Sequence, residues 1–192
     1  MIDEGHFERA GHLAYVPMPG GTAAIQAPWR MAASYLQDAY GKDFHELGLP
    51  VLKEIGNDKL TIISEMITKG VNAPLTSSLG RLFDGVAAIC GIRSQVNFEG
   101  QAAMELEMLA GGTAGSTYDY EWLSDDTYKI LPAPIVLGVV KDLQNGKSVA
   151  DISAKFHWTL ICLFVDLCAV IRKDRGLNRV VLSGGVLQNA IL

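Results

Sequence analysis

The chain has 192 residues and a net charge of -5, with 49% hydrophobic residues and a mean hydropathy of +0.20. This composition excludes a disordered chain, and an acidic chain without a block of Lys or Arg is a poor candidate for nonspecific binding to nucleic acid or anionic membranes. The longest apolar run, 158–171, contains Asp166 and is shorter than the roughly 20 residues that a membrane span needs. We therefore expect one domain or two small ones, without a nucleic-acid or membrane partner.

The N-terminus lacks the basic and apolar regions of a signal peptide. The three cysteines, Cys90, Cys162 and Cys168, form no CxxC pair, and Cys90 and Cys162 lie in apolar runs. This pattern argues against a disulfide framework and predicts buried free thiols in a reducing, cytoplasmic compartment.

Residues 1–73 are predicted to combine one short strand with several helices. The strand is expected at Leu13–Val16, and the Pro- and Gly-rich run 17–21 is expected to break regular structure. A helix begins near Pro28 and ends at Gly41, because apolar residues between them recur at helical spacing. Short helical pieces follow over 42–73, the clearest at Lys59–Thr68.

Residues 74–192 carry the stronger periodic patterns. Ser77 or Ser78 is a plausible N-cap for the first of these helices, and Gly176 stops the last. Helices are predicted at 77–90, 99–110, 132–143 and 149–173, with a hairpin at 117–131. A buried strand is then expected at Arg179–Leu182, leading through a glycine turn into another helix. The pattern predicts a helix-rich α/β fold.

The run 180–189 is the sharpest local feature, because it reads as strand, tight glycine turn and helix. Gly184 and Gly185 would let a ligand approach the backbone, and the helix N-terminus would offer N–H groups to a phosphate or an adenine-ribose unit. Asn189 would face the same ligand or simply bond the loop. On these residues alone, an ordinary strand-to-helix turn is about as probable.

Two further features stand near predicted helix starts. Asp84 is interpreted either as an exposed or capping carboxylate, the simpler reading, or as a group that grips ribose hydroxyls. Gly100 marks a possible close approach of backbone to ligand. Glu105 and Glu107 form no paired-carboxylate site, because positions two apart do not face each other on a helix.

The four histidines, His6, His12, His45 and His157, form no metal-binding spacing. His157 lies in the strongest amphipathic helix, where a hydrogen-bonded structural histidine is the default interpretation. No nucleophile elbow, P-loop or GxGxxG motif is present.

Several motifs, in order along the chain, resemble the HypF family of carbamoyltransferases of [NiFe]-hydrogenase maturation. They are residues 7–13, 17–21, 28–32, 74–88, 98–107, 156–160 and 182–189. The resemblance covers essentially the whole chain and implies part of a two-lobed actin/sugar-kinase/Hsp70-type (ASKHA, RNase H-like) fold. Within it, 1–73 would be an N-terminal strand and helical segment and 74–192 a nucleotide-binding lobe.

The resemblance also implies an activity. In that family, carbamoyladenylate made from carbamoyl phosphate and ATP donates its carbamoyl group to the C-terminal cysteine of a HypE-type acceptor protein, toward the cyanide ligands of the metal site. Carried over to this chain, Asp84 would hold ribose, Gly100 would line the nucleoside, Gly184 and Gly185 would accept the nucleotide, and Asn189 would contact it.

The resemblance leaves the catalytic residues unassigned. The complete family domain holds a divalent metal (zinc, iron or magnesium) through an upstream HxxxH pair and a late Asp, which are expected to lie outside this chain, so it is expected to bind nucleotide weakly and to be inactive alone. Two alternatives stay open: a related O-carbamoyltransferase or tRNA threonylcarbamoyladenosine-forming protein, and a non-catalytic interaction remnant.

Overall fold

The computed structural model describes residues 5, 8–111 and 115–192. One of the residues discussed above, His6, lies outside these ranges. Helices make up most of the fold, and the longer ones are α2 (Trp29–Tyr40), α4 (Asn57–Lys69), α5 (Leu79–Ile89), α6 (Gln101–Leu109), α7 (Ala133–Gln144) and α8 (Val149–Arg175). Shorter helices are α1 (Ala23–Gln26), η1 (Gly41–Leu47) and α3 (Pro50–Ile55). The helices predicted from periodicity are confirmed to within a few residues.

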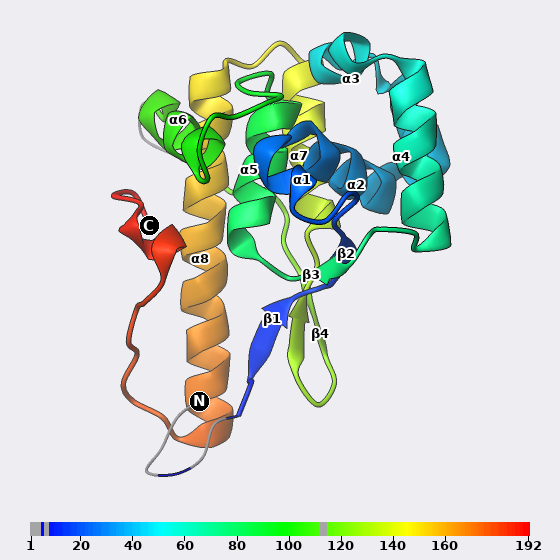
Figure 1. Cartoon of the computed structure of the whole chain (residues 1–192). Helices are drawn as coiled ribbons and strands as arrows, with labels where there is room; N and C mark the ends of the chain where they lie inside the picture. Colours follow the sequence, from blue (N-terminus) through cyan, green and yellow to red (C-terminus); the bar gives the residue numbers. More distant parts are fainter. Residues whose placement is uncertain (1–4, 6–7, 112–114) are drawn as a thin grey trace.

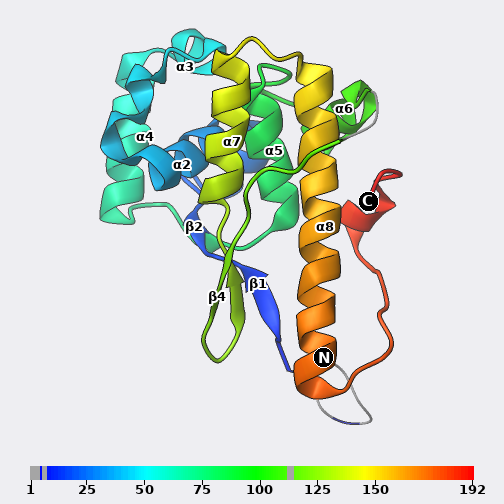
Figure 2. The same cartoon turned by 180° about the vertical axis from the view of Figure 1, so that it is seen from behind.

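The core forms around α5, which packs against α2 and α6, and α7 packs against both α2 and α5 (Figures 1 and 2). Helix α8 packs against α6 and α7 at one edge of the molecule, and α3 and α4 lie at the opposite edge. Apolar side chains on the inward faces of these helices are almost fully buried, among them Met31, Tyr35, Leu82, Phe83, Val86, Ile135, Val139, Phe156 and Leu160.

The strands are short and form two small sheets. Strand β1 (Gly11–Leu13) pairs in parallel with β5 (Tyr128–Ile130), which pairs antiparallel with β4 (Trp122–Ser124). Strand β2 (Val16–Pro17) pairs antiparallel with β3 (Leu75–Thr76). The strand predicted at Leu13–Val16 is therefore two strands in different sheets, and the predicted breaker Pro17 is part of the second.

The predicted hairpin is present but shorter than expected. Its strands cover 122–124 and 128–130, whereas the prediction began at residue 117. The backbone N–H of Tyr118 donates to Thr159 Oγ1 at 2.9 Å, and the Tyr118 side chain is buried. This contact holds the start of the segment against α8. The alternating tyrosines there reflect packing against a helix and do not form a strand.

The strand predicted at Arg179–Leu182 is wrong. This stretch has no regular structure, and Val180, Val181 and Leu182 are 64%, 87% and 68% exposed. A strand requires a hydrogen-bonded neighbour, and none of the described strands pairs with this segment. The predicted helix after it is also wrong: η2 (Gly185–Gln188) is a single short 3-10 turn, and Asn189 is already extended. In both views the segment returns beside α8 (Figures 1 and 2).

Helix α8 has 27 residues and is long and apolar enough, by length and composition alone, to cross a membrane. Its most apolar window has a mean hydropathy of 1.7, and 33% of that window is buried inside the fold. The core helix of a soluble protein has the same properties, and α8 packs on α6 and α7. The absence of a membrane partner stays a prediction.

The three cysteines carry free thiols, as predicted. Cys90 is buried, and burial raises the pKa of its thiol to about 12. Cys162 is only partly buried, contrary to expectation, because it lies away from the innermost face of α8.

Candidate functional site

A cavity of about 590 Å³ opens where α5, α6 and η2 meet. Its walls come from segments that are far apart in the sequence. The lining residues are Ser78, Gly80, Arg81, Phe83, Asp84, Glu99, Gly100, Ala103, Met104, Glu107, Met108, Gly185, Val186, Gln188 and Asn189.

The structure brings four of the five predicted binding residues to this cavity: Asp84, Gly100, Gly185 and Asn189. Gly184 does not line it but precedes η2 with φ of 103°, a left-handed region that favours glycine. Gly100 has φ of 86° at the N-cap of α6, where the chain turns into the helix. The binding roles of all five stay predictions.

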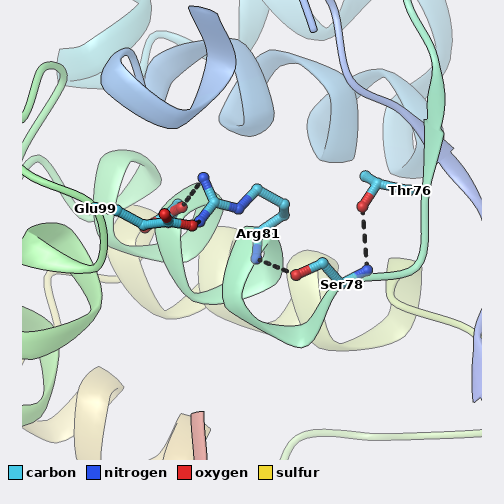
Figure 3. A network of polar contacts seen from close by, with 5 residues as sticks. Thr76, Ser78, Arg81 and Glu99 are labelled. Carbon is cyan, nitrogen blue, oxygen red and sulfur yellow. Dashed lines mark hydrogen bonds and ion pairs between the residues drawn. The ribbon is translucent and has the colours of Figure 1, made fainter. Parts of the chain in front are cut away.

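The start of α5 is fixed by side-chain capping. Ser78 Oγ accepts from the backbone N–H of Arg81 at 3.4 Å, and the Ser78 N–H donates to Thr76 Oγ1 at 3.2 Å (Figure 3). Ser78 is therefore the N-cap, one of the two candidates from the sequence. The cap sets the helical register that places Arg81 and Asp84 on one face, three residues apart.

Arg81 and Asp84 form a buried ion pair on this face. An Arg81 terminal nitrogen lies 2.9 Å from Asp84 Oδ2, and the other lies 3.1 Å from Glu99 Oε1, which comes from the loop before α6 (Figure 3). The side chains of Arg81 and Asp84 are 9% and 3% exposed. Arg81 Nη1 and Asp84 Oδ2, the two atoms of the 2.9 Å contact, make no aligned hydrogen bond. The guanidinium group can therefore still donate a hydrogen bond here, and the carboxylate can still accept one.

Burial raises the pKa of Asp84 to about 6, with the Arg81 charge opposing and the Glu99 charge adding to this shift. The carboxylate is therefore ionised at neutral pH but close to titration. A buried carboxylate that lines a cavity and has a raised pKa is a candidate for ligand binding.

The opposite wall of the cavity, formed by α6, is largely apolar. Met104 and Met108 lie one turn apart and are 47% and 75% exposed. Glu107 also lines the cavity, and its Oε1 accepts from the backbone N–H of Ala190 at 2.8 Å. Glu105 instead pairs with Arg93 at 2.7 Å, as expected for a residue that does not share a face with Glu107.

His157 is buried and hydrogen-bonded, as predicted for a structural histidine. Its Nδ1 lies 2.8 Å from the Ser153 carbonyl oxygen, and its ring packs edge-on to that of Phe83 at 5.3 Å between centroids. Its Nε2, however, lies 3.0 Å from Asn189 Nδ2. No sequence pattern predicted this contact with Asn189, a predicted binding residue.

Sequence reasoning also missed Arg81 and Glu99 as cavity residues. Arg81 could have been found from its i, i+3 spacing to Asp84, which puts opposite charges on one helical face. Glu99 reaches the cavity through a loop, and no local pattern predicts such a position.

The metal implied by the family resemblance does not fit the described residues. Within residues 5, 8–111 and 115–192 no group of three or more His, Cys, Asp or Glu side chains is placed to hold an ion. We therefore assign no chemical step to a metal on this chain.

Comparisons with known proteins agree on one family. The family model described as "Carbamoyltransferase, Kae1-like Domain, second subdomain" matches residues 1–192. The carbamoyltransferase HypF of Rhizobium leguminosarum bv. viciae is 36% identical over all of this chain and 24% of its own length. A crystal structure of full-length HypF in a phosphate- and nucleotide-bound form is 41% identical with a TM-score of 0.87, over 96% of this chain and 28% of that chain.

The HypF of T. kodakarensis gives a TM-score of 0.80 at 25% identity, over 96% of this chain and 25% of that one. The chain thus spans about a quarter of the length of these three relatives, and it has their helix-rich α/β fold, consistent with the ASKHA type. The chain belongs to the HypF carbamoyltransferase family, as the second subdomain of its Kae1-like domain.

Proposed function

We propose that this chain forms part of the nucleotide cleft of a cytoplasmic carbamoyltransferase of [NiFe]-hydrogenase maturation. The substrate is carbamoyladenylate, made from carbamoyl phosphate and ATP, and the acceptor is the C-terminal cysteine of a HypE-type protein. The thiolate attacks the carbamoyl carbon, a C–S bond forms, and the bond from that carbon to the phosphate oxygen breaks, releasing AMP.

One observation carries the proposal: the cavity joins a buried carboxylate–guanidinium pair to an apolar wall beside a glycine turn. A nucleoside has the matching chemistry, with an apolar base and a sugar bearing two adjacent hydroxyls. The related full-length HypF structure, which is in a phosphate- and nucleotide-bound form, supports the same ligand class.

The side chains of the cavity would act on the adenylate and not on the reacting carbon. Asp84 accepts a hydrogen bond from a ribose hydroxyl, and Arg81 donates one to the neighbouring hydroxyl oxygen. The base lies against Ala103, Met104 and Val186, where its faces leave water. Gly185 leaves room for the nucleotide beside the backbone.

Isothermal titration with ATP, and with a non-hydrolysable carbamoyladenylate analogue, tests the proposal. Asp84→Ala is expected to weaken binding roughly tenfold or more, because it removes a charge-assisted hydrogen bond. Asp126→Ala removes an exposed carboxylate in the hairpin turn, far from the lining residues, and serves as the matched control. Equal affinities in wild type, Asp84→Ala and Asn189→Ala would contradict the mapping.

A transfer assay separates binding from catalysis. The chain alone, mixed with carbamoyladenylate and a HypE-type acceptor, is expected to transfer no carbamoyl group, because we assign no nucleophile or base to its described residues. Carbamoylated acceptor, detected by mass spectrometry, would overturn this expectation.

A further inference from the structure

We infer that His157 is a positioning residue: as the neutral Nδ1–H tautomer it accepts a hydrogen bond from Asn189 and, together with the backbone N–H groups of Ile191 and Leu192, sets which atom of Asn189 faces the cavity. The inference rests on the proposed function for its consequence in ligand binding. Its geometric part stands on the contacts around Asn189 alone.

The polarity of this hydrogen-bond chain is fixed at its C-terminal end. Asn189 Oδ1 lies 2.9 Å from the backbone N of Ile191 and 3.2 Å from that of Leu192. Backbone N–H groups only donate, so the side-chain atom that they share must be the oxygen. The amide nitrogen of Asn189 therefore points to His157 Nε2, 3.0 Å away, and donates to it.

The contacts of His157, at the other end of this series of hydrogen bonds, give the same polarity independently. His157 Nδ1 lies 2.8 Å from the Ser153 carbonyl oxygen, which only accepts, so Nδ1 carries the proton. Nε2 of a neutral imidazole with that proton is an acceptor, as the Asn189 amide requires. Ser153 Oγ in turn donates to the Leu106 carbonyl oxygen, which links α8 to α6.

The surroundings of the imidazole favour its neutral form. Burial lowers the pKa of His157, while the Ser153 carbonyl and the Glu107 charge oppose the shift. Glu107 is the charged group that α6 directs toward it, α5 presents the Phe83 ring, and α8 itself presents Ser153 and Phe156. Protonation of Nε2 would place its N–H group opposite the N–H group of the Asn189 amide. Two donors cannot form a hydrogen bond, so the contact with Asn189 would break.

This arrangement restricts what Asn189 can offer a ligand. Its oxygen is occupied by two backbone N–H groups, and one amide hydrogen is held by His157. The second amide hydrogen is left for the cavity that Asn189 lines. The ligand atom at this position must therefore be an acceptor, such as a phosphate or ribose oxygen.

The test is an NMR titration of 15N-histidine-labelled protein. The wild type is expected to show the Nδ1–H tautomer with a pKa below 6.5, and Asn189→Asp is expected to raise the His157 pKa by about one unit or more, because a carboxylate favours the imidazolium. Gln188→Glu adds the same charge one residue away as the matched control, and the signals of His12 and His45 are internal references. A His157 pKa that is unchanged in Asn189→Asp would overturn the inference.

Binding of ATP provides the second readout. His157→Leu is expected to weaken binding about fivefold, the worth of one hydrogen bond, and His157→Gln, which keeps an acceptor near the position of Nε2, is expected to restore part of it. Combining His157→Leu with Asn189→Ala should weaken binding no more than Asn189→Ala alone, whereas additive losses would contradict the positioning role. If no variant binds ATP, including the wild type, while Asn189→Asp still moves the pKa, the proposed function fails and the tautomer assignment stands.

Discussion

Asp84 shows how one buried side chain combines a proposed binding role with a cost to stability. It lies 2.9 Å from the Arg81 guanidinium, yet burial outweighs that attraction and raises its pKa to about 6. The pKa of this carboxyl group is higher in the folded state than its unfolded value of 3.8. Its contribution to the free energy of unfolding is therefore greatest below pH 3.8, where the group is protonated in both states. That contribution is lost as pH rises through 6, so at neutral pH the ionised group weakens the fold.

We expect Asp84→Asn to reveal this loss through a pH-dependent difference from the wild type. As pH falls from 7 to 5, the free energy of unfolding of the wild type should rise by about 1 kcal/mol relative to the variant, from a shift of this size. Urea unfolding of both proteins at the two pH values measures the change. Asp126→Asn, at an exposed site, is the control, and parallel pH profiles for the wild type and Asp84→Asn would exclude the raised pKa.

The sequence pointed to Asp84 and Gly185, which line the cavity, because each lies in a local motif, whereas Gly184 of the same turn does not line it. It could not identify the contact between His157 and Asn189, because 32 residues separate them and only the return of the chain beside α8 brings them together. The apolar helix around His157 predicted burial correctly but carried no information about its partner.

Helices α2 and α5 approach closely at Gly85. A Cβ atom added there would lie 2.7 Å from a ring carbon of Tyr35, which is 1% exposed. The ring is held in the core and has little room to move, so close packing of the two helices depends on glycine at this position.

Gly85→Ala should therefore lower the free energy of unfolding by about 1–3 kcal/mol, the usual range for overpacking. Gly80→Ala is the matched control on the same helix, since its Cβ would meet other atoms at 3.6 Å, an ordinary contact. Helix propensity favours alanine by up to about 1 kcal/mol, so the control should be neutral or stabilising. Thermal unfolding of both variants gives the comparison. A Gly85→Ala variant as stable as the wild type would show that the Tyr35 ring can move to make room for the added methyl group.

At the same scale, the periodic helices were predicted to within a few residues, whereas the strands were predicted only in part. The helices follow from apolar spacing and from stops such as Gly41 and Gly176, all of which lie within one segment. The stretch Arg179–Leu182 has a strand-like composition, but a strand needs a partner elsewhere in the chain, and the described strands do not supply one.

The whole molecule is a packed helical body with an extended return segment. Residues 177–184 connect the end of α8 to η2, and they are exposed throughout. The end of the chain is held back on the body through Asn189 and through the bond from Ala190 to Glu107. One wall of the cavity therefore depends on a segment that makes few contacts between its two ends.

Limited digestion with trypsin should cut first after Arg179, because a protease needs extended, exposed backbone and the basic residues Arg172, Lys173 and Arg175 lie within α8. Mass spectrometry over a time course identifies the first cut, and Arg179→Gln should delay it. The remaining body should keep its helical circular dichroism but lose ATP affinity, because Gly185 and Asn189 leave with the released peptide. An early cut inside α4 or α7, with the return segment intact, would show that the segment is packed more firmly than its exposure indicates.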